Sequence, residues 1–398
     1  MANARLESLR DYPFERLTRL LDGVPPFGNA PPINMSIGEP QHEPPAIVRD
    51  LVDRGHPTWN RYPPINGTPE FRRAALGWLE RRYSLPAGMV EPDTMIFPCA
   101  GTREGLYMAA TVAISPATGG APAPFALMPN PAYQVYIGAA TLAGAEPVYL
   151  PATAANRFLP DLDAIPAETL ARAQIMYLCT PSNPQGAVAD LAYLKKAIGL
   201  ARRHGFLFVA DECYAEIYST DRKPPGALEA AAELGGSLDN LMVFHTLSKR
   251  SSVPGLRSGF GVGAKKETQL MQRLRTYAAA ATPLAALDAA TALWRDDAHV
   301  EATRALYRRK FDMAERILGK RFGFTRPEGG FYLWLDVGDG EAATKRLWEK
   351  AGVKALPGAY LTRPEPDGTN AGTPYIRLAL VADLEATEEA LNRIARVL

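Results

Sequence analysis

This chain of 398 residues has only three cysteines, a net charge of only +1 and few long apolar runs. Its three cysteines, Cys99, Cys179 and Cys213, lie in or next to apolar runs, so we expect buried free thiols rather than disulfides. The histidines and cysteines show no metal-ligand spacing, so no metal is expected. The 44 basic and 43 acidic residues are interspersed, which disfavours nucleic acid or a membrane as a partner. Neither a transmembrane run nor a signal peptide is present, so we expect a cytoplasmic protein.

The order of apolar and polar segments predicts two domains after an N-terminal arm. From about residue 92 to 264, strand-like apolar runs alternate with helical segments, which predicts a mainly parallel α/β sheet. We therefore place a Pro/Gly-rich arm at residues 1–32 and a large α/β domain at 33–290. Residues 291–398 begin with a long charged helix and predict a smaller α+β domain, joined by residues near the N-terminus.

One lysine follows a strand-like apolar run in a setting that suits chemistry. Lys249 is preceded by Thr246 and Ser248, and Arg257 follows after a Pro-Gly turn. A desolvated lysine loses its proton readily and becomes a nucleophile. The two hydroxyls and the arginine suit a phosphate group, so the stretch predicts pyridoxal phosphate held as a Schiff base. A lone loop lysine is more often a solvated charge, so other residues must support this interpretation.

Further polar residues follow other predicted strands, and in open α/β sheets ligands bind at that edge. Asp211 ends an apolar run that is typical of a buried strand. A buried acid needs a cationic partner, such as a protonated pyridine nitrogen. The alternative is that Asp211 caps a helix or lies on the surface. Gly101 and Thr102 open a helix whose N–H groups suit an anion, or form a simple N-cap. Asn183 is held between two prolines, and Tyr133 either stacks on a planar ring or fills the core.

Three residues elsewhere in the chain are also candidates for the site. Gly38 lets the backbone approach a ligand, although a turn glycine is the simpler explanation. Tyr62 stands before two prolines and is expected to be exposed or at an interface. Arg377 interrupts an apolar strand, so it either faces outward or is buried with a carboxylate.

Taken together, four motifs resemble those of the class I/II aminotransferases, which are fold-type I pyridoxal-phosphate enzymes. The motifs are Pro181-Ser182-Asn183-Pro184, Asp211-Glu212-Cys213-Tyr214, Ser248-Lys249 with Arg257 eight positions on, and Arg377 in a C-terminal strand. The resemblance extends over nearly the whole chain. It implies the aspartate aminotransferase-like α/β fold, pyridoxal 5′-phosphate as cofactor, and transfer of an amino group between small amino acids and keto acids.

The resemblance also implies a role for each candidate residue. Lys249 carries the internal aldimine and moves the proton, Asp211 holds the pyridine nitrogen protonated, and Tyr133 stacks on the ring. The phenolic oxygen of the ring is bound by Asn183 and Tyr214. The phosphate is bound by Gly101, Thr102, Thr246 and Arg257, with Arg103 adjacent and Tyr62 reaching in from the partner of a two-fold homodimer. The substrate is bound by Arg377, Asn183 and the backbone of Gly38. Ala100 and Thr246 replace the usual serines, and Ala100 loses one phosphate contact.

The finer pattern of residues 248–260 is similar to the proteobacterial succinyldiaminopimelate aminotransferases. That resemblance implies exchange of an amino group between N-succinyl-LL-2,6-diaminopimelate and 2-oxoglutarate, with glutamate as donor in the reverse direction, in lysine and diaminopimelate biosynthesis. Arg103 and Arg250 are, by position, candidates for contacts to the substrate's additional polar groups.

Other interpretations remain open. One is a class I aminotransferase for aspartate, alanine or aromatic substrates, and another is a pyridoxal-phosphate carbon–sulfur β-lyase of the same fold. A catalytically silent regulator is disfavoured, because such regulators usually carry a basic DNA-binding domain that this chain lacks.

Overall fold

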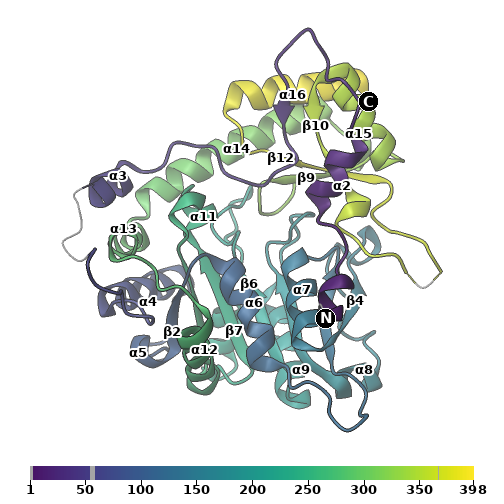
Figure 1. Ribbon diagram of the computed structural model, residues 1–398. Coiled ribbons are helices and arrows are strands. Elements are labelled where there is room, and N and C mark those ends of the chain that lie inside the picture. Colours follow the sequence, from purple (N-terminus) through teal and green to yellow (C-terminus); the bar gives the residue numbers. More distant parts are fainter. Residues whose placement is uncertain (1–2, 54–58, 366) are drawn as a thin grey trace.

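The computed structural model describes residues 3–53, 59–365 and 367–398, which form two units, each built around its own sheet (Figure 1). The larger unit has a seven-stranded sheet in the order β2-β8-β7-β6-β5-β3-β4. Its strands are β2 (Ile96–Cys99), β3 (Phe125–Asn130), β4 (Glu146–Pro151), β5 (Ala173–Cys179), β6 (Leu207–Asp211), β7 (Leu241–Thr246) and β8 (Gly259–Gly263). Only β8 runs antiparallel to its neighbours. The predicted, mainly parallel α/β sheet is therefore confirmed.

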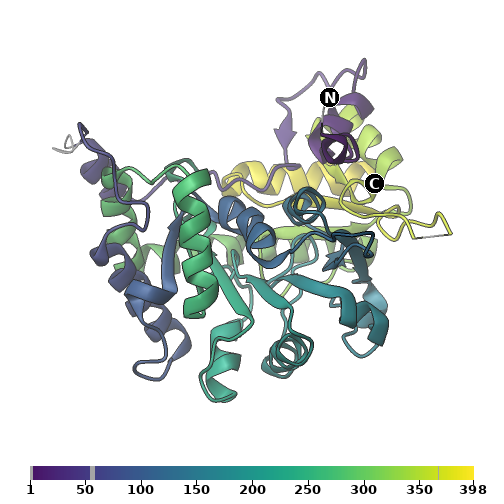
Figure 2. The ribbon, with the colours of Figure 1, turned by 60° about the horizontal axis from the view of Figure 1, so that its bottom comes forward.

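Helices cover both faces of this sheet, as the turned view shows (Figure 2). Successive side chains of a strand point to opposite faces, so Phe208 joins one apolar core and Val209 the other. One core includes residues of α4 (Pro69–Tyr83), α8 (Ala167–Arg172), α9 (Leu191–His204), α10 (Ala227–Glu233) and α13 (Leu284–Arg295). The other includes residues of α6 (Thr102–Ala113), α7 (Gln134–Ala143) and α12 (Lys265–Ala278). Burial on both faces explains why the central strands are continuous apolar runs.

The smaller unit has an antiparallel sheet in the order β11-β12-β9. Its elements are α14 (Ala298–Leu318), β9 (Tyr332–Asp336), α15 (Gly340–Ala351), β10 (Val353–Lys354), β11 (Leu356–Pro357), β12 (Tyr375–Ala379) and α16 (Leu384–Val397). N-terminal segments join it, because β1 (Ile33–Asn34) pairs with β10, and Leu17 of α2 (Pro13–Leu20) shares a core with Leu356. The domain boundaries drawn after residues 32 and 290 stay a proposal.

The remaining elements are short. They are the helices α1 (Ala4–Glu7), α3 (Ala46–Asp53), α5 (Pro92–Met95) and α11 (Leu247–Arg250), and the 3₁₀ turns at Ala154–Asn156, Pro254–Leu256, Arg321–Gly323 and Gly358–Tyr360. Within the described ranges, no helix has both the length and the apolar character needed to cross a bilayer.

Helix boundaries follow from residues that the sequence shows directly. Thr68 accepts a hydrogen bond from the backbone N–H of Phe71 at 3.2 Å, and Pro69 occupies the first turn of α4, where it costs no hydrogen bond. Asp190 caps α9 in the same way, and Gly205 ends that helix with a left-handed φ of +76°. Capping by Thr68 and Asp190 therefore determines where α4 and α9 begin.

The helix α14 leads from the larger unit into the smaller one and carries a fully buried lysine (Figure 1). The Lys310 Nζ lies 2.7 Å from His42 Nε2 and donates a hydrogen bond to the Leu380 carbonyl at 3.0 Å. Burial lowers the pKa of Lys310 to about 7. Burial, together with the charge of Lys310, lowers the pKa of His42 to about 4.

We expect this lysine to make the folding stability depend on pH. The pKa of Lys310 is lower in the folded state than the ordinary value of about 10.4, so between those values the folded state binds fewer protons than the unfolded state. Stability then rises with pH from about 7 to about 10. In Lys310→Met this rise should be smaller, as measured by urea unfolding across the interval, and the part that remains is the contribution of the buried Lys249, whose pKa is also lowered.

The matched control is Lys266→Met, which removes an exposed lysine of α12. This control should keep the wild-type rise. If Lys310→Met kept it as well, the titrating group would lie elsewhere.

Candidate active site

A cavity of about 450 Å³ opens where β5, β6 and β7 end, and the smaller unit forms part of its wall. The cavity brings together twelve of the fourteen candidate residues: Gly38, Gly101, Thr102, Arg103, Tyr133, Asn183, Asp211, Tyr214, Thr246, Lys249, Arg257 and Arg377. The exceptions are Arg250, described below, and Tyr62, whose side chain is fully exposed and does not line the cavity of its own chain. Residues distant in sequence meet here because parallel strands end at one sheet edge.

Lys249 lies on the short helix α11, which begins directly after β7. The helix starts there because the Thr246 hydroxyl accepts a hydrogen bond from the Ser248 N–H at 3.1 Å. The Lys249 Nζ donates a hydrogen bond to the Gly38 carbonyl at 2.5 Å. Burial lowers the pKa of Lys249 to about 8, and the charges of Arg377 and Arg257 act in the same direction. The neutral, nucleophilic amine therefore forms at a lower pH than it does for an ordinary lysine.

Asp211 is the last residue of β6, and its side chain is buried at the floor of the cavity. Its Oδ2 accepts a hydrogen bond from the Tyr136 hydroxyl at 2.5 Å, and its Oδ1 accepts one from the Cys213 N–H at 3.3 Å. Burial raises the pKa of Asp211, while the two hydrogen bonds and the charge of Lys249 oppose that shift. Asp211 is therefore not a surface residue, which was one of the alternatives that the sequence left open. A bound cation would supply the positive charge that this buried carboxylate needs.

The cavity lining also includes a cation beside a turn that requires glycine. Arg257 donates hydrogen bonds to the carbonyls of Pro254 and Ala100, both at 2.9 Å. Gly101 has a φ of +80°, and a Cβ there would collide with the Arg257 guanidinium. No acidic partner of Arg257 occurs among the described residues, which leaves its charge available to an anion. An amine, a buried carboxylate and this cation in one cavity fit pyridoxal phosphate.

Arg377 belongs to β12 of the smaller unit and is buried, with 4% of its surface exposed. It donates hydrogen bonds to Asn183 Oδ1 at 3.0 Å and to the Ser36 carbonyl at 2.7 Å. The sequence left two alternatives, an outward-facing side chain or one buried with a carboxylate. Arg377 is buried, and no carboxylate in the described part of the chain pairs with it, so neither alternative is correct as stated. A buried guanidinium without an acid is suited to a carboxylate supplied by a ligand.

Sequence reasoning missed two tyrosines that hold predicted site residues in place. Tyr136 binds Asp211, and the Tyr332 hydroxyl lies 3.1 Å from that of Tyr214, whose own role stays a prediction. Tyr332 also lies under the Arg377 guanidinium, 4.5 Å from its carbon to the ring centre. A Cβ at Gly38 would overlap the Tyr332 hydroxyl, so the glycine there is sterically required. In sequence, Tyr136 and Tyr332 are only aromatic residues of an apolar helix and an apolar strand.

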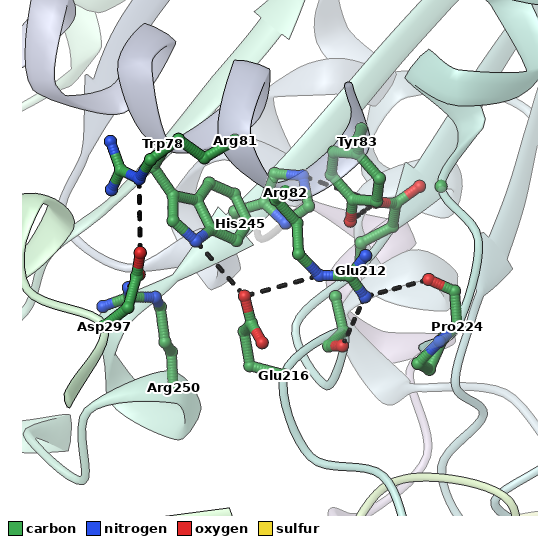
Figure 3. Close-up of polar contacts among 12 residues, drawn as sticks. Trp78, Arg81, Arg82, Tyr83, Glu212, Glu216, Pro224, His245, Arg250 and Asp297 are labelled. Carbon is green, nitrogen blue, oxygen red and sulfur yellow. Dashed lines mark hydrogen bonds and ion pairs between the residues drawn. The ribbon is translucent and has the colours of Figure 1, made fainter. Parts of the chain in front are cut away.

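Arg250 was a candidate for substrate contact because it follows Lys249, and the structure corrects this prediction. Its side chain is buried outside the cavity, near Trp78 (Figure 3). The ring of Trp294 also lies beside it, 5.1 Å from the guanidinium carbon to the ring centre. It donates hydrogen bonds to the Leu293 carbonyl at 2.8 Å and to Asp297 Oδ1 at 2.6 Å. Arg250 therefore anchors α11 to the junction of α13 and α14.

Two buried carboxylates, Glu212 and Glu216, connect the segment after β6 to the surrounding helices (Figure 3). Glu212 accepts hydrogen bonds from the Tyr83 hydroxyl at 2.7 Å and from the Ala227 N–H at 2.6 Å, and burial raises its pKa to about 7. Glu216 forms ion pairs with Arg82 at 3.4 Å and Arg304 at 2.6 Å. The residues that follow Asp211 are thus tied to α4, α10 and α14.

Comparison with known proteins gives concordant results over nearly the whole chain. The sequence model of the family described as aminotransferase class I and II matches residues 30–394. LL-diaminopimelate aminotransferase of Dehalococcoides mccartyi is 32% identical over 400 residues, covering 98% of this chain and 97% of the relative. A solved aminotransferase of Neisseria meningitidis is 38% identical with a TM-score of 0.93, covering 99% of both chains. A probable N-succinyldiaminopimelate aminotransferase of Thermus thermophilus is 26% identical with a TM-score of 0.84, covering 97% of this chain and 100% of its own.

The lowered pKa of Lys249 predicts selective modification of this lysine. In protein stripped of cofactor, an amine-reactive reagent such as trinitrobenzenesulfonate should modify Lys249 with a half-maximal rate near pH 8. An ordinary exposed lysine reaches that point only near pH 10.4. Peptide mass spectrometry at a series of pH values measures both in one sample, with Lys266 as the internal control. A half-maximal rate for Lys249 near that of Lys266 would contradict the desolvated environment.

Proposed function

This chain belongs to the class I and II aminotransferases, and from that starting point we propose that it transfers an amino group between N-succinyl-LL-2,6-diaminopimelate and 2-oxoglutarate. Its cofactor is pyridoxal 5′-phosphate, on which the family depends. The observation that supports amino transfer by these residues is the single cavity lined by Lys249, Asp211 and Arg377. The succinylated substrate is supported by the pattern of residues 248–260 and by the name of the Thermus neighbour.

In this proposal, the cofactor is held by groups on three walls of the cavity. Pyridoxal phosphate, when bound, supplies a sink for the electrons left behind when the substrate's α-hydrogen departs as a proton. Asp211, oriented by Tyr136 and the Cys213 N–H, pairs with the pyridine nitrogen. Tyr133 packs on the ring, and Asn183 and Tyr214 bind its phenolic oxygen. The phosphate is held by Gly101, Thr102, Thr246 and Arg257, with Arg103 adjacent.

The remaining residues act on the substrate. Arg377 holds the α-carboxylate in a two-pronged ion pair, and its bond to Asn183 fixes the plane of the guanidinium. The Gly38 backbone assists this binding. With the cofactor bound, the Lys249 amine would take the proton from the substrate's α-carbon as a general base and then donate it as a general acid. Its pKa of about 8 keeps both protonation states accessible near neutral pH.

Tyr62 has a role in this proposal only if the protein is a homodimer. Its side chain is fully exposed and lies outside the cavity of its own chain. A two-fold dimer in which Tyr62 reaches the phosphate site of the partner subunit would bury this aromatic ring and complete the phosphate ligands.

A second candidate substrate is LL-diaminopimelate itself. It is favoured by the relative from Dehalococcoides mccartyi, which is named for that activity and is 32% identical over nearly its full length. The two candidates differ at the distal nitrogen, which is a charged amine in one substrate and a neutral amide in the other.

Purified enzyme with bound cofactor should form glutamate from 2-oxoglutarate and N-succinyl-LL-diaminopimelate. We expect kcat/KM for this substrate to exceed that for LL-diaminopimelate by at least about tenfold, because a site built for an uncharged amide does not pair a charged amine. Glutamate formation measured with each donor in turn makes the comparison. Lys249→Ala is the matched control and should form none with either.

Faster turnover of LL-diaminopimelate would establish the second candidate instead. Turnover of only aspartate, alanine or an aromatic amino acid would refute both diaminopimelate substrates and retain the family. Pyruvate released from cystathionine without a keto acid would indicate a carbon–sulfur lyase.

A further inference from the structure

A chain of side-chain hydrogen bonds begins two residues after Lys249, and the proposed function does not use it. The Ser251 hydroxyl oxygen lies 2.8 Å from His299 Nε2, and His299 Nδ1 lies 2.8 Å from Asp296 Oδ2. The Asp296 carboxylate is itself oriented, because its Oδ1 accepts a hydrogen bond from the Ala298 N–H at 2.9 Å. Serine, histidine and aspartate in this order also form the triad of serine hydrolases. Ser251, however, has no exposed surface and does not line the cavity, so it cannot attack a substrate.

The direction of this chain follows from the chemistry of its members. An ionised carboxylate only accepts hydrogen bonds, so the proton on His299 Nδ1 is donated to Asp296. Burial lowers the pKa of His299, and the neutral ring therefore predominates at neutral pH and above. Nε2 of the neutral ring then accepts a hydrogen bond from the Ser251 hydroxyl. The chain thus joins the end of α11 to the start of α14.

The helix α11 depends on such contacts, because it has only four residues. So short a helix is not stable by itself. Its first turn is held by the bond from the Ser248 N–H to the Thr246 hydroxyl. At its other end, the Ser251 N–H donates a hydrogen bond to the Leu247 carbonyl at 2.9 Å, which closes the turn that contains Lys249. The position of Lys249 is therefore determined by what holds its neighbours.

The two residues after Lys249 are both tied to the segment where α14 begins. Arg250 donates a hydrogen bond to Asp297 Oδ1 at 2.6 Å, and Ser251 is bonded to His299. Successive side chains of a helix point in directions about 100° apart. A single tie would leave α11 free to turn about it, whereas two ties in different directions fix its rotation.

We propose that His299 is a positioning residue for Lys249: by holding Ser251, it fixes the rotation of α11 that directs the lysine amine into the cavity. The proposal rests on the proposed function in taking Lys249 as the group that moves the proton. His299 does not line the cavity, and Arg377 binds the substrate from another element. Loss of His299 should therefore slow the reaction without weakening substrate binding. A misplacement of about 1 Å can slow a reaction by about a hundredfold.

The test uses His299→Leu, which removes both ring nitrogens, and Ser251→Ala, which removes only the hydroxyl. With bound cofactor, glutamate formation is measured with whichever diaminopimelate donor the wild type uses faster. We expect kcat to fall about tenfold in each variant, because the lysine amine is misplaced, and KM for the donor to stay within about twofold.

A second measurement needs no turnover. In protein stripped of cofactor, trinitrobenzenesulfonate should modify Lys249 with a half-maximal rate near pH 8 in the wild type. In both variants this midpoint should rise by about one pH unit, because an amine that leaves its desolvated position keeps its proton to higher pH. A loss of stability alone would change neither this midpoint nor the kcat of the folded enzyme.

Three further variants show whether the effect passes through the bond between Ser251 and His299. His299→Gln keeps a polar group that can bond to Ser251, so it should recover part of the kcat. The double variant of Ser251→Ala and His299→Leu should be no slower than His299→Leu, because both changes break the same bond. Arg309→Met, which removes an exposed arginine of α14, should match wild type in every assay.

Two outcomes would overturn the proposal. The first is a Ser251→Ala variant in which the Lys249 midpoint and kcat are both unchanged, and this variant gives the answer even if His299→Leu does not fold. The second is a double variant in which the two effects add, because Ser251 and His299 would then act separately. A midpoint that rises as expected, in a protein whose wild type transfers no amino group, would refute the proposed function alone.

Discussion

The buried carboxylate of Asp211 at the end of β6 is the constraint on which the rest of the site depends. A charge at the end of a strand covered on both faces loses its hydration, and burial raises the pKa of Asp211 accordingly. Tyr136 and the Cys213 N–H supply two hydrogen bonds, and neither supplies a positive charge. In the proposed function, the pyridine nitrogen of the cofactor is the cation that meets this need.

In the proposed function, residues from both units of the molecule bind the substrate. Arg377 comes from the sheet of the smaller unit and binds Asn183, which follows β5 of the larger one. The segment after β1 passes between them, with its Gly38 carbonyl bound to Lys249 and its Ser36 carbonyl bound to Arg377. A change in the position of the smaller unit would move the arginine relative to the lysine. The segment after β1 therefore links Lys249 and Arg377 through direct hydrogen bonds.

Selectivity in such a site follows from the cations that the protein leaves unpaired. Arg377 lies over Tyr332, and Arg103 is held by Tyr133, so a tyrosine places each guanidinium and no described carboxylate neutralises it. By contrast, Arg250 is paired with Asp297, donates hydrogen bonds to backbone carbonyls and belongs to the scaffold. The difference between a binding arginine and a structural one is thus visible in its partners. An unpaired cation in a cavity favours a ligand that brings the missing negative charge.

Much of this arrangement follows from the sequence, because its signals are local. Alternating apolar runs and helices determined the parallel sheet, and polar residues after strands determined which side chains share its edge. The partners of those residues are not local. Tyr136 and Tyr332 support the site from an apolar helix and strand, where an aromatic residue gives no sign of a polar task. Arg250 follows Lys249 directly, yet a helix turns each successive side chain by about 100°, which points one into the cavity and the next into the core. Residue type and order thus determined the chemistry available, and only the tertiary structure decided which charges are paired, because pairing depends on distances between segments far apart in the chain.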